Sequence, residues 1–415
     1  MNRKLSIGGW CLMNTGTDPF GAPVRKYDLL MAMHAAKIAG ISHISWHDAD
    51  LWPDDASANQ IDERIDEVLG FCSETGLVTL NFTSNTFSHP AFRAGALSNP
   101  SQTVRDAALG KALRAVDQAN AFGAKNMIWW GGREGDDYAH ASDAGDGLNL
   151  YLTGVLMCMA YGRRKGYRFG HSVEPKQYEP RLGELYPATA HRIIAWAEAN
   201  RELLDGLSLE MRVNPEYPQH VQMLGMSAVI ELEMLLKSDY LADFIHWGGQ
   251  IPGRLDCDLP PYWGDNDLAN SLSVFALERA AWDGVIELDC RPPRTTVTEG
   301  GWPTSSATAL TTSVGASGSV KRWMTIQKSD SYAQTTSRDA RTTSSSRPAT
   351  ATGMGSTLKS CACRAWDSRR PRPSTPTGLS DTWCAPKRSC APPRRASTLY
   401  PSVIWQREEP QSLKH

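Results

Sequence analysis

The chain has 415 residues, a formal net charge of −2, 41% hydrophobic residues and 21% charged residues, which indicates one large globular domain or two ordinary ones. No apolar run approaches the roughly 18 residues of a membrane-spanning helix, and the apolar stretch near the start is too short and too rich in glycine for a signal peptide. Nine scattered cysteines without repeated zinc spacing favour a reduced, cytoplasmic protein.

The predicted elements alternate between short β-rich runs and amphipathic helical stretches. The predicted strands span 4–10, 43–47, 77–82, 125–130, 168–174, 207–213, 242–247 and 284–289. The predicted helices include 27–40, 60–76, 103–123, 188–206 and 266–284. This alternation is typical of parallel βαβ units in α/β proteins, and eight such strands favour a (β/α)8 TIM barrel.

A doubly wound open sheet is the alternative fold. That fold would favour a glycine-rich phosphate loop after the first strand. The sequence "GGREG" at 131–135 follows the fourth predicted strand instead and lacks the GxGxxG spacing, so we interpret it as a tight turn.

Charge divides the chain near Trp302. Residues 303–415 hold 17 basic and 6 acidic residues, whereas residues 1–302 hold 26 basic and 39 acidic residues. The 303–415 segment is rich in Ser, Thr, Arg and Pro without strand or helix periodicity, a composition that cannot offset the entropy of ordering. We therefore predict a barrel domain over 1–302 and a basic, disordered tail over 303–415.

Parallel barrels carry their chemistry at the carboxyl ends of the strands. Acids, histidines and aromatic residues lie at the ends of the predicted strands or in the loops that follow, at Trp10, His47, Asp48, Asp50, Phe87, Trp130, Glu174, Glu216, His220, His246, Asp256, Asp258 and Asp289. Carboxylates that converge on one buried mouth repel one another, and divalent cations remove that conflict. Oxygen ligands with an imidazole suit Mg²⁺ or Mn²⁺, and Co²⁺ as well.

The fifth predicted strand ends in acids and bases. Glu174 and Lys176 lie two residues apart, so on a strand they share a face. This geometry suits a metal ligand beside a cation that polarises a substrate oxygen. The alternative is a solvated strand end with surface ion pairs, each of which contributes little.

Seven motifs between residues 5 and 302 resemble those of the xylose (glucose) isomerase family, in its shorter actinobacterial type, in order and nearly in spacing. They are "WHDADLWP" (46–53), "NTFSHPAF" (85–92), "WGGREG" (130–135), "VEPKQYEPR" (173–181), "NPE" with a following histidine (214–220), "DCDL" (256–259) and "LDCRPPRT" (288–295). The joint agreement of seven motifs is a specific signal.

The resemblance implies a site with two divalent cations per subunit. Ligands of the first cation are Glu174, Glu216 and Asp289, with His246 at a further ligand position, and those of the second are Glu216, His220, Asp256 and Asp258, with Glu216 bridging. It also implies that His47 assists opening of the cyclic sugar, oriented by Asp50, and that Lys176 holds the substrate O1. Trp10, Phe87 and Trp130 then resemble the apolar wall, and Phe20 the aromatic residue that reaches into a neighbouring subunit.

The implied activity interconverts D-xylose with D-xylulose, and D-glucose with D-fructose, by a 1,2-hydride shift. The expected partners are a small aldose and further copies of the chain in a homotetramer, without nucleic acid or membrane. Another sugar isomerase or epimerase of the same barrel superfamily is one alternative. An inactive metal-binding barrel, caused by a disrupted C-terminus, is the other.

The sequence departs from the family at the metal site and in the tail. His246 stands where the family has an aspartate, which disfavours Mg²⁺, so restoring Asp is predicted to strengthen binding of the first cation. One additional residue separates Glu216 from His220, and Asn14 replaces a wall tryptophan. The resemblance stops at Trp302, so the eighth helix and the C-terminal arm are predicted to be disrupted, by a shifted reading frame or by a basic tail that binds nucleic acid.

Overall fold

The residues that the structure describes all lie within the unit Met1–Ser345. In this computed structural model, the described residues are 4–13, 28–53, 55–138, 141–179, 183–218, 220–221, 225–249, 251, 258–259 and 267–291. Asn14, Phe20 and Asp256 lie outside the described residues, as do the predicted boundary near Trp302, the eighth helix, the arm and the 303–415 tail.

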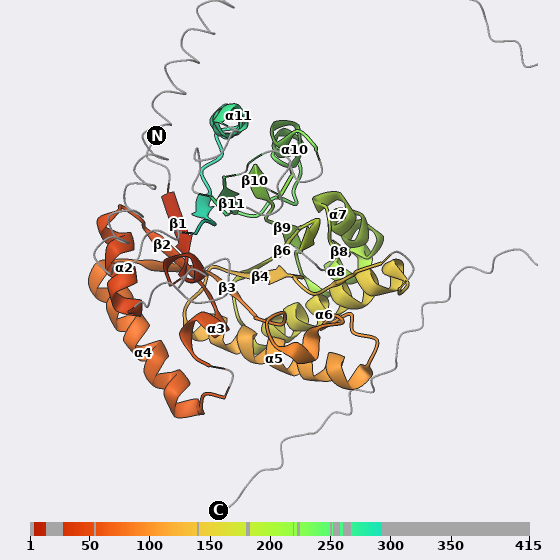
Figure 1. The fold of residues 1–415 in the computed structure, drawn as a ribbon, viewed down its shortest axis with the longest axis horizontal. Helices are drawn as coiled ribbons and strands as arrows, with labels where there is room; N and C mark the ends of the chain where they lie inside the picture. The colour runs from red at the N-terminus through yellow and green to blue at the C-terminus, as the bar shows by residue number, and fades with distance from the viewer. Residues whose placement is uncertain are drawn as a thin grey trace, which may run out of the picture. The chain divides into compact units, whose positions relative to one another are not determined.

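Parallel strands form the centre of this unit (Figure 1). They are β1 (Lys4–Gly8), β2 (His43–His47), β3 (Val78–Thr83), β4 (Asn126–Trp130), β6 (Gly170–Glu174), β9 (Arg212–Val213), β10 (Glu216–Pro218), β11 (Phe244–Gly248) and β12 (Val285–Leu288). Their order in the sheet is β10-β11-β12-β1-β2-β3-β4-β6-β9. Every pairing within this sheet is parallel, as the βαβ alternation predicts.

The sheet closes on itself through the segment 212–218. β9 pairs with β6, whereas β10, only two residues further along the chain, pairs with β11. β9 and β10 are therefore two halves of one barrel strand, and eight barrel positions are filled among the described residues. The prediction of a (β/α)8 barrel is confirmed, and the open-sheet alternative is wrong.

Helices lie around the strands (Figure 1). They are α2 (Leu29–Ile38), α4 (Ala58–Thr75), α5 (Gln102–Ala121), α6 (Ala144–Lys165), α7 (Ala190–Ala199), α8 (Arg201–Leu207), α10 (Ala228–Leu235) and α11 (Asp267–Arg279). Short helices α1 (Gly9–Leu12) and α3 (Asp48–Leu51) follow β1 and β2 directly, and η1 is a 3-10 turn at Pro90–Phe92. A small antiparallel sheet joins β5 (Gly135–Asp136), β7 (Tyr178–Glu179) and β8 (Gly183–Leu185).

Local signals explain where the helices begin and end. The side chain of Ser57 accepts a hydrogen bond from the backbone N–H of Gln60, and α4 ends at Gly76 with φ of 70°, a left-handed conformation that glycine adopts easily. Asp143 caps α6 in the same way, and Gly166 with φ of 83° ends it. α6 has 22 residues and was missing from the predicted helices, although both of its caps are legible in the sequence.

The sixth predicted strand begins too early. The prediction placed it at 207–213, but α8 continues to Leu207, and Ser208 turns the chain with φ of 54°. The barrel strand then runs through β9 and β10, to Pro218. This shift matters for function because it places Glu216 within the strand rather than in the loop after it.

Large apolar side chains fill the core on both sides of the strands. Ile7, Trp46, Phe82, Tyr217 and Phe244 are among the largest fully buried side chains. The "GGREG" segment is a tight turn, as predicted, because the backbone N–H of Glu134 donates to the carbonyl of Gly131. Among the described helices, none combines the length and apolarity needed to cross a bilayer.

Candidate active site

A cavity of about 310 Å³ opens at the carboxyl ends of the strands. It is lined by Trp10, His47, Thr83, Phe87, Trp130, Glu174, Lys176, His220, His246, Asp258 and Asp289. All but Thr83 are residues that the sequence analysis placed in the site. Parallel strands that end at one rim bring these residues together, although they are spread over more than 270 positions of the chain.

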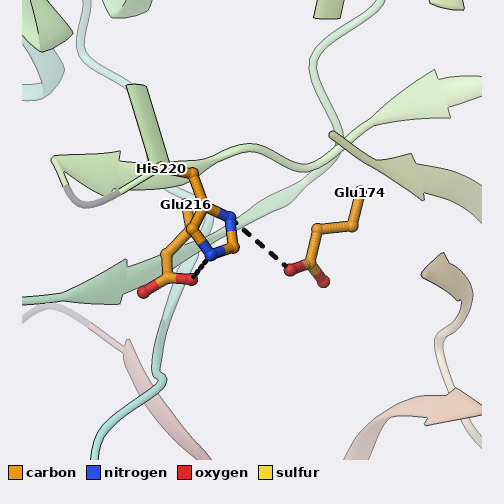
Figure 2. Close-up of side chains that lie close together, drawn as sticks. All are labelled: Glu174, Glu216 and His220. Carbon is orange, nitrogen blue, oxygen red and sulfur yellow. Dashed lines mark ion pairs between the residues drawn. The ribbon is translucent and has the colours of Figure 1, made fainter. Parts of the chain in front are cut away.

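One group of possible metal ligands combines Glu174, Glu216 and His220 (Figure 2). One ligand atom from each lies within 4.8 Å of the others, and all three side chains are buried. Nε2 of His220 lies 2.9 Å from a carboxylate oxygen of Glu216, and its Nδ1 lies 3.9 Å from Glu174. The histidine ring therefore faces both carboxylates, one from β10 and one from the end of β6.

A second group combines Glu174, His246 and Asp289, again with ligand atoms within 4.8 Å of one another. Nδ1 of His246 lies 3.0 Å from Oε2 of Glu174. Trp10 donates a hydrogen bond of 2.9 Å from its indole Nε1 to Oδ1 of Asp289. Glu174 belongs to both groups, so it is the carboxylate that these two clusters share, whereas the resemblance assigns the bridging position to Glu216.

The two clusters fit divalent cations. Atom pairs such as His246–Glu174 and His220–Glu216 are separated by 3.0 and 2.9 Å. Two neighbouring ligands, each about 2.1 Å from one octahedral ion, are about 3 Å apart. Nδ1 of His246 is buried and lies 3.0 Å from Oε2 of Glu174, so a cation that displaces the proton from this nitrogen can take it as a ligand. The donor set of carboxylates and imidazoles suits Mn²⁺ or Co²⁺.

The charges of the site shift the pKa values of its buried groups. Burial lowers the pKa of His246, but the carboxylates of Glu174 and Glu287 outweigh that effect and raise this pKa well above its usual value. Burial raises the pKa of Glu174, but His246, His220 and Lys176 outweigh it and hold the carboxyl pKa below its usual value. Glu174 is therefore an ionised carboxylate, as a ligand of a divalent cation must be.

Aromatic rings form a continuous wall on one side of the cavity. The ring centroids of Trp10 and His47 are 4.4 Å apart, those of His47 and Phe87 are 5.5 Å apart, and those of Phe87 and Trp130 are 4.4 Å apart. Edge-to-face contacts of this kind stabilise the arrangement beyond simple burial. The wall gives the cavity an apolar side, and Trp10 joins it to the carboxylate of Asp289.

Asp50 lies beside His47. Oδ2 of Asp50 lies 3.4 Å from Nδ1 of His47 and accepts a 2.8 Å hydrogen bond from its backbone N–H. Burial lowers the pKa of His47, but the nearby carboxylates, Asp50 above all, outweigh burial and raise it. Nε2 is the ring nitrogen that does not face Asp50.

Lys176 is a buried cation beside the carboxylates. Its side chain is only 5% exposed, and Nζ lies 5.0 Å from the centroid of the Trp130 ring. An ammonium group above an aromatic face is attracted by the ring. The interpretation of 174–176 as a solvated strand end is wrong, because both side chains are buried and line the cavity.

Asp258 also reaches the cavity, with a strained backbone. Its φ is 43°, in the left-handed region that residues other than glycine seldom adopt. Its carbonyl accepts a 2.8 Å hydrogen bond from the N–H of Arg291. Asp256 and Phe20 lie outside the described residues, so their proposed roles stay predictions.

Two buried acids near the site were not singled out from the sequence. Glu134 accepts hydrogen bonds from the backbone N–H groups of Leu97 and Ser98, at 2.9 and 3.0 Å, and so ties the loop after β3 to the loop after β4. Glu287, on β12, faces Nε2 of His246 at a distance of 3.0 Å. Within a strand, Glu287 shares a face with Asp289 two positions later, and that spacing was the available signal.

The names of several solved structures with a similar fold refer to sugar epimerases or to a xylose isomerase domain. The chain is similar to a structure of L-ribulose 3-epimerase, with a TM-score of 0.52 and 11% identity over 78% of this chain and 97% of that one. It is also similar to a D-psicose 3-epimerase solved with D-fructose, at 0.52 and 11% over 76% and 99%. A xylose isomerase domain protein from Alicyclobacillus acidocaldarius gives 0.52 and 11% over 77% and 99%.

These likenesses concern the fold. Identities of 11% lie far below the level at which activity can be transferred, so they show a (β/α)8 barrel fold alone and leave membership of the xylose isomerase family a prediction. No model of a known protein family matches the chain.

Proposed function

We propose that this chain is a metal-dependent aldose–ketose isomerase that interconverts D-xylose with D-xylulose, and D-glucose with D-fructose, by a 1,2-hydride shift. The observation that carries the proposal is the pair of carboxylate–histidine clusters that share Glu174, in one cavity with an aromatic wall and a buried lysine. When bound there, two divalent cations would polarise the oxygens on C1 and C2 of an open-chain sugar.

Side chains of the site carry out proton transfer, charge stabilisation and exclusion of water. Asp50 holds the His47 ring, so that Nε2 is left to transfer the proton that accompanies opening of the cyclic sugar. The ammonium group of Lys176 stabilises negative charge that develops at O1. The rings of Trp10, Phe87 and Trp130 exclude water, which disfavours exchange of the migrating hydrogen with solvent.

A label experiment tests the reaction type. The protein, supplied with Mn²⁺ or Co²⁺, is incubated with D-xylose deuterated at C2, and the product is followed by NMR. We expect D-xylulose with the deuterium retained on C1, because a hydride shift moves the hydrogen within the sugar. Complete loss of the label to water would contradict the hydride shift.

A sugar 3-epimerase is the second candidate function. It is favoured by the names of the similar structures, which include an L-ribulose 3-epimerase and a D-psicose 3-epimerase. Formation of D-psicose from D-fructose, without any aldose, would replace the isomerase proposal by this one. Cation binding without turnover of any of these sugars would leave the third possibility, an inactive metal-binding barrel.

His47→Gln is expected to slow reaction of the cyclic sugar selectively. Loss of one proton-transfer group costs about 100-fold or more, so kcat/KM for the cyclic sugar should fall by that order. An open-chain sugar analogue does not need ring opening and should react at nearly the wild-type rate. Parallel kinetics on both substrates provide the measurement.

The matched control is His89→Gln. His89 caps η1 at the edge of the same region, where its Nδ1 accepts a hydrogen bond from the N–H of Ala91. This variant should leave both rates unchanged. Equal losses on both substrates in His47→Gln would remove His47 from ring opening.

The proposal extends to the oligomeric state of the protein. We propose a homotetramer in which Phe20 reaches a neighbouring subunit. If the 303–415 segment is read from a shifted frame, the association of the subunits is weakened. Sedimentation of the chain as written, beside a chain with the frame restored after Trp302, compares the two. A stable tetramer of the chain as written would contradict the frame-shift interpretation.

A further inference from the structure

Glu287 is a fully buried carboxylate in the interior of the barrel. It lies on β12 between two neighbouring strands, and the strand register pairs it with Ser6 on β1 and with His246 on β11. Its side chain and that of Ser6 are 0% exposed, and that of His246 is 2% exposed. Burial of an ionised carboxylate costs free energy unless hydrogen bonds replace the lost water, so the partners of Glu287 decide how it is tolerated.

Three donors from three strands hold one oxygen of this carboxylate. Oε2 accepts hydrogen bonds of 2.9 Å from Oγ of Ser6 and 2.9 Å from Nδ2 of Asn81, and another from Oγ of Ser45. These donors come from β1, β2 and β3, and all are fully buried. The carboxylate is therefore fixed in position by the barrel wall itself.

The other oxygen faces His246. Oε1 lies 3.0 Å from Nε2 of His246, within hydrogen-bond distance. With Nε2 so engaged, the ring turns Nδ1 toward Glu174, and this nitrogen lies 3.0 Å from Oε2 of that carboxylate. In metal sites, a carboxylate behind a histidine fixes the tautomer and the orientation of the ring, and raises its basicity as a ligand.

We propose that Glu287 is a positioning residue that fixes the His246 ring with Nδ1 presented to the metal cluster, and that this nitrogen donor makes the cluster prefer Co²⁺ over Mg²⁺. Hard Mg²⁺ prefers oxygen ligands, whereas imidazole binds Co²⁺ well. The inference rests on the proposed function only in requiring that the cluster of Glu174, His246 and Asp289 binds a cation.

The competing explanation is that the polar network only packs the barrel interior. In that case, loss of Glu287 would lower the stability of the protein and weaken all cations alike. In the positioning role, loss of Glu287 changes the ratio of the two affinities, because only the contribution of the nitrogen ligand is lost. The ratio therefore separates the two explanations.

The experiment is calorimetric titration of the full chain with Co²⁺ and, separately, Mg²⁺, without sugar. Glu287→Gln keeps the shape of the side chain and removes the carboxylate behind His246. We expect it to weaken Co²⁺ binding by about 10- to 100-fold, as loss of a partner behind a ligand typically does, and Mg²⁺ binding much less. An unchanged ratio of Co²⁺ to Mg²⁺ affinity would overturn the proposal.

Ser6→Ala is the matched control, because it removes one donor to Oε2 and leaves Oε1 facing His246. It should lower the melting temperature without changing the affinity ratio. Glu287→Asp provides the same readout if the glutamine variant does not fold, since it keeps the charge but withdraws the carboxylate from the ring. An unchanged ratio in Glu287→Asp would overturn the proposal as well.

The proposal also changes the outcome expected for His246→Asp. A carboxylate at position 246 would lie near Glu287, and two neighbouring carboxylates repel each other. The double variant His246→Asp with Glu287→Gln should therefore bind Mg²⁺ more tightly than His246→Asp alone. A wild-type chain that binds neither ion overturns this inference, whereas one that binds both but isomerises no sugar overturns the proposed function alone.

Discussion

Lys176→Met is expected to reduce turnover by at least about 100- to 1,000-fold, the usual cost of removing one group that stabilises developing charge. The Nζ atom of Lys176 is buried, above the Trp130 ring and close to Glu174, in the cavity where the sugar would lie. Methionine has a similar length and keeps the apolar contact with the ring, so the fold should be retained. Kinetics with saturating cation and sugar provide the measurement.

Cation binding separates this role from a structural one. Lys176 is one of the positive groups that hold the pKa of Glu174 below its usual value, so it repels any cation that Glu174 binds. Lys176→Met should therefore bind Co²⁺ at least as tightly as the wild type while it loses turnover. Near-normal turnover, or loss of cation binding together with turnover, would contradict the assignment of Lys176 to the substrate.

Glu174→Gln is expected to weaken both cation sites at once. Glu174 is the one carboxylate shared by the two ligand clusters of the described residues, with His220 and Glu216 in one and with His246 and Asp289 in the other. Loss of a partner that lies behind a ligand can already cost about 100-fold in affinity, and a ligand oxygen itself should cost more. Titration with Mn²⁺ measures the affinity of both sites, with calorimetry or the magnetic resonance signal of free Mn²⁺ as the readout.

Glu210→Gln is the control for this change of charge. The Glu210 side chain is exposed and pairs with Arg212 outside the cavity, so its loss removes one negative charge without touching the site. Its binding curve should coincide with that of the wild type. A Glu174→Gln variant that loses only one of two binding events would show that the clusters are served by separate carboxylates.

Most of the fold could be predicted from the sequence, because the hydrophobic pattern and the alternation of strands and helices are properties of short segments of the chain. All eight predicted strands are present, and the error at 207–213 arose where "LSLEMRV" has the composition of a strand. There α8 ends only at Leu207, and Ser208 turns the chain before the strand begins. Residues within one strand also cannot reveal that β9 and β10 pair with different neighbours. The closure of the barrel is a property of three segments together.

The site was legible in part, for a different reason. Residues at strand ends could be assigned to one mouth because the fold brings such ends together, and the family resemblance grouped Glu174, Glu216 and Asp289 with His246. The structure brings Glu174, His246 and Asp289 together in one cluster. The role of Glu287 could not be assigned in this way. The position of the Glu287 carboxylate depends on hydrogen bonds from Ser6, Ser45 and Asn81, which lie more than 200 positions earlier in the chain.

The pairing of β1 with β12 has a practical consequence for attaching the protein to a surface. Lys4 is exposed and lies level with Val285, at the end of the barrel where the strands begin. Asp289 follows Val285 by four residues, a rise of about 13 Å along the strand. A tether at residue 4 would therefore leave the mouth of the cavity facing the solution, open to sugar and to cations. A tether at Arg291 would instead be anchored at the rim, two residues from Asp289.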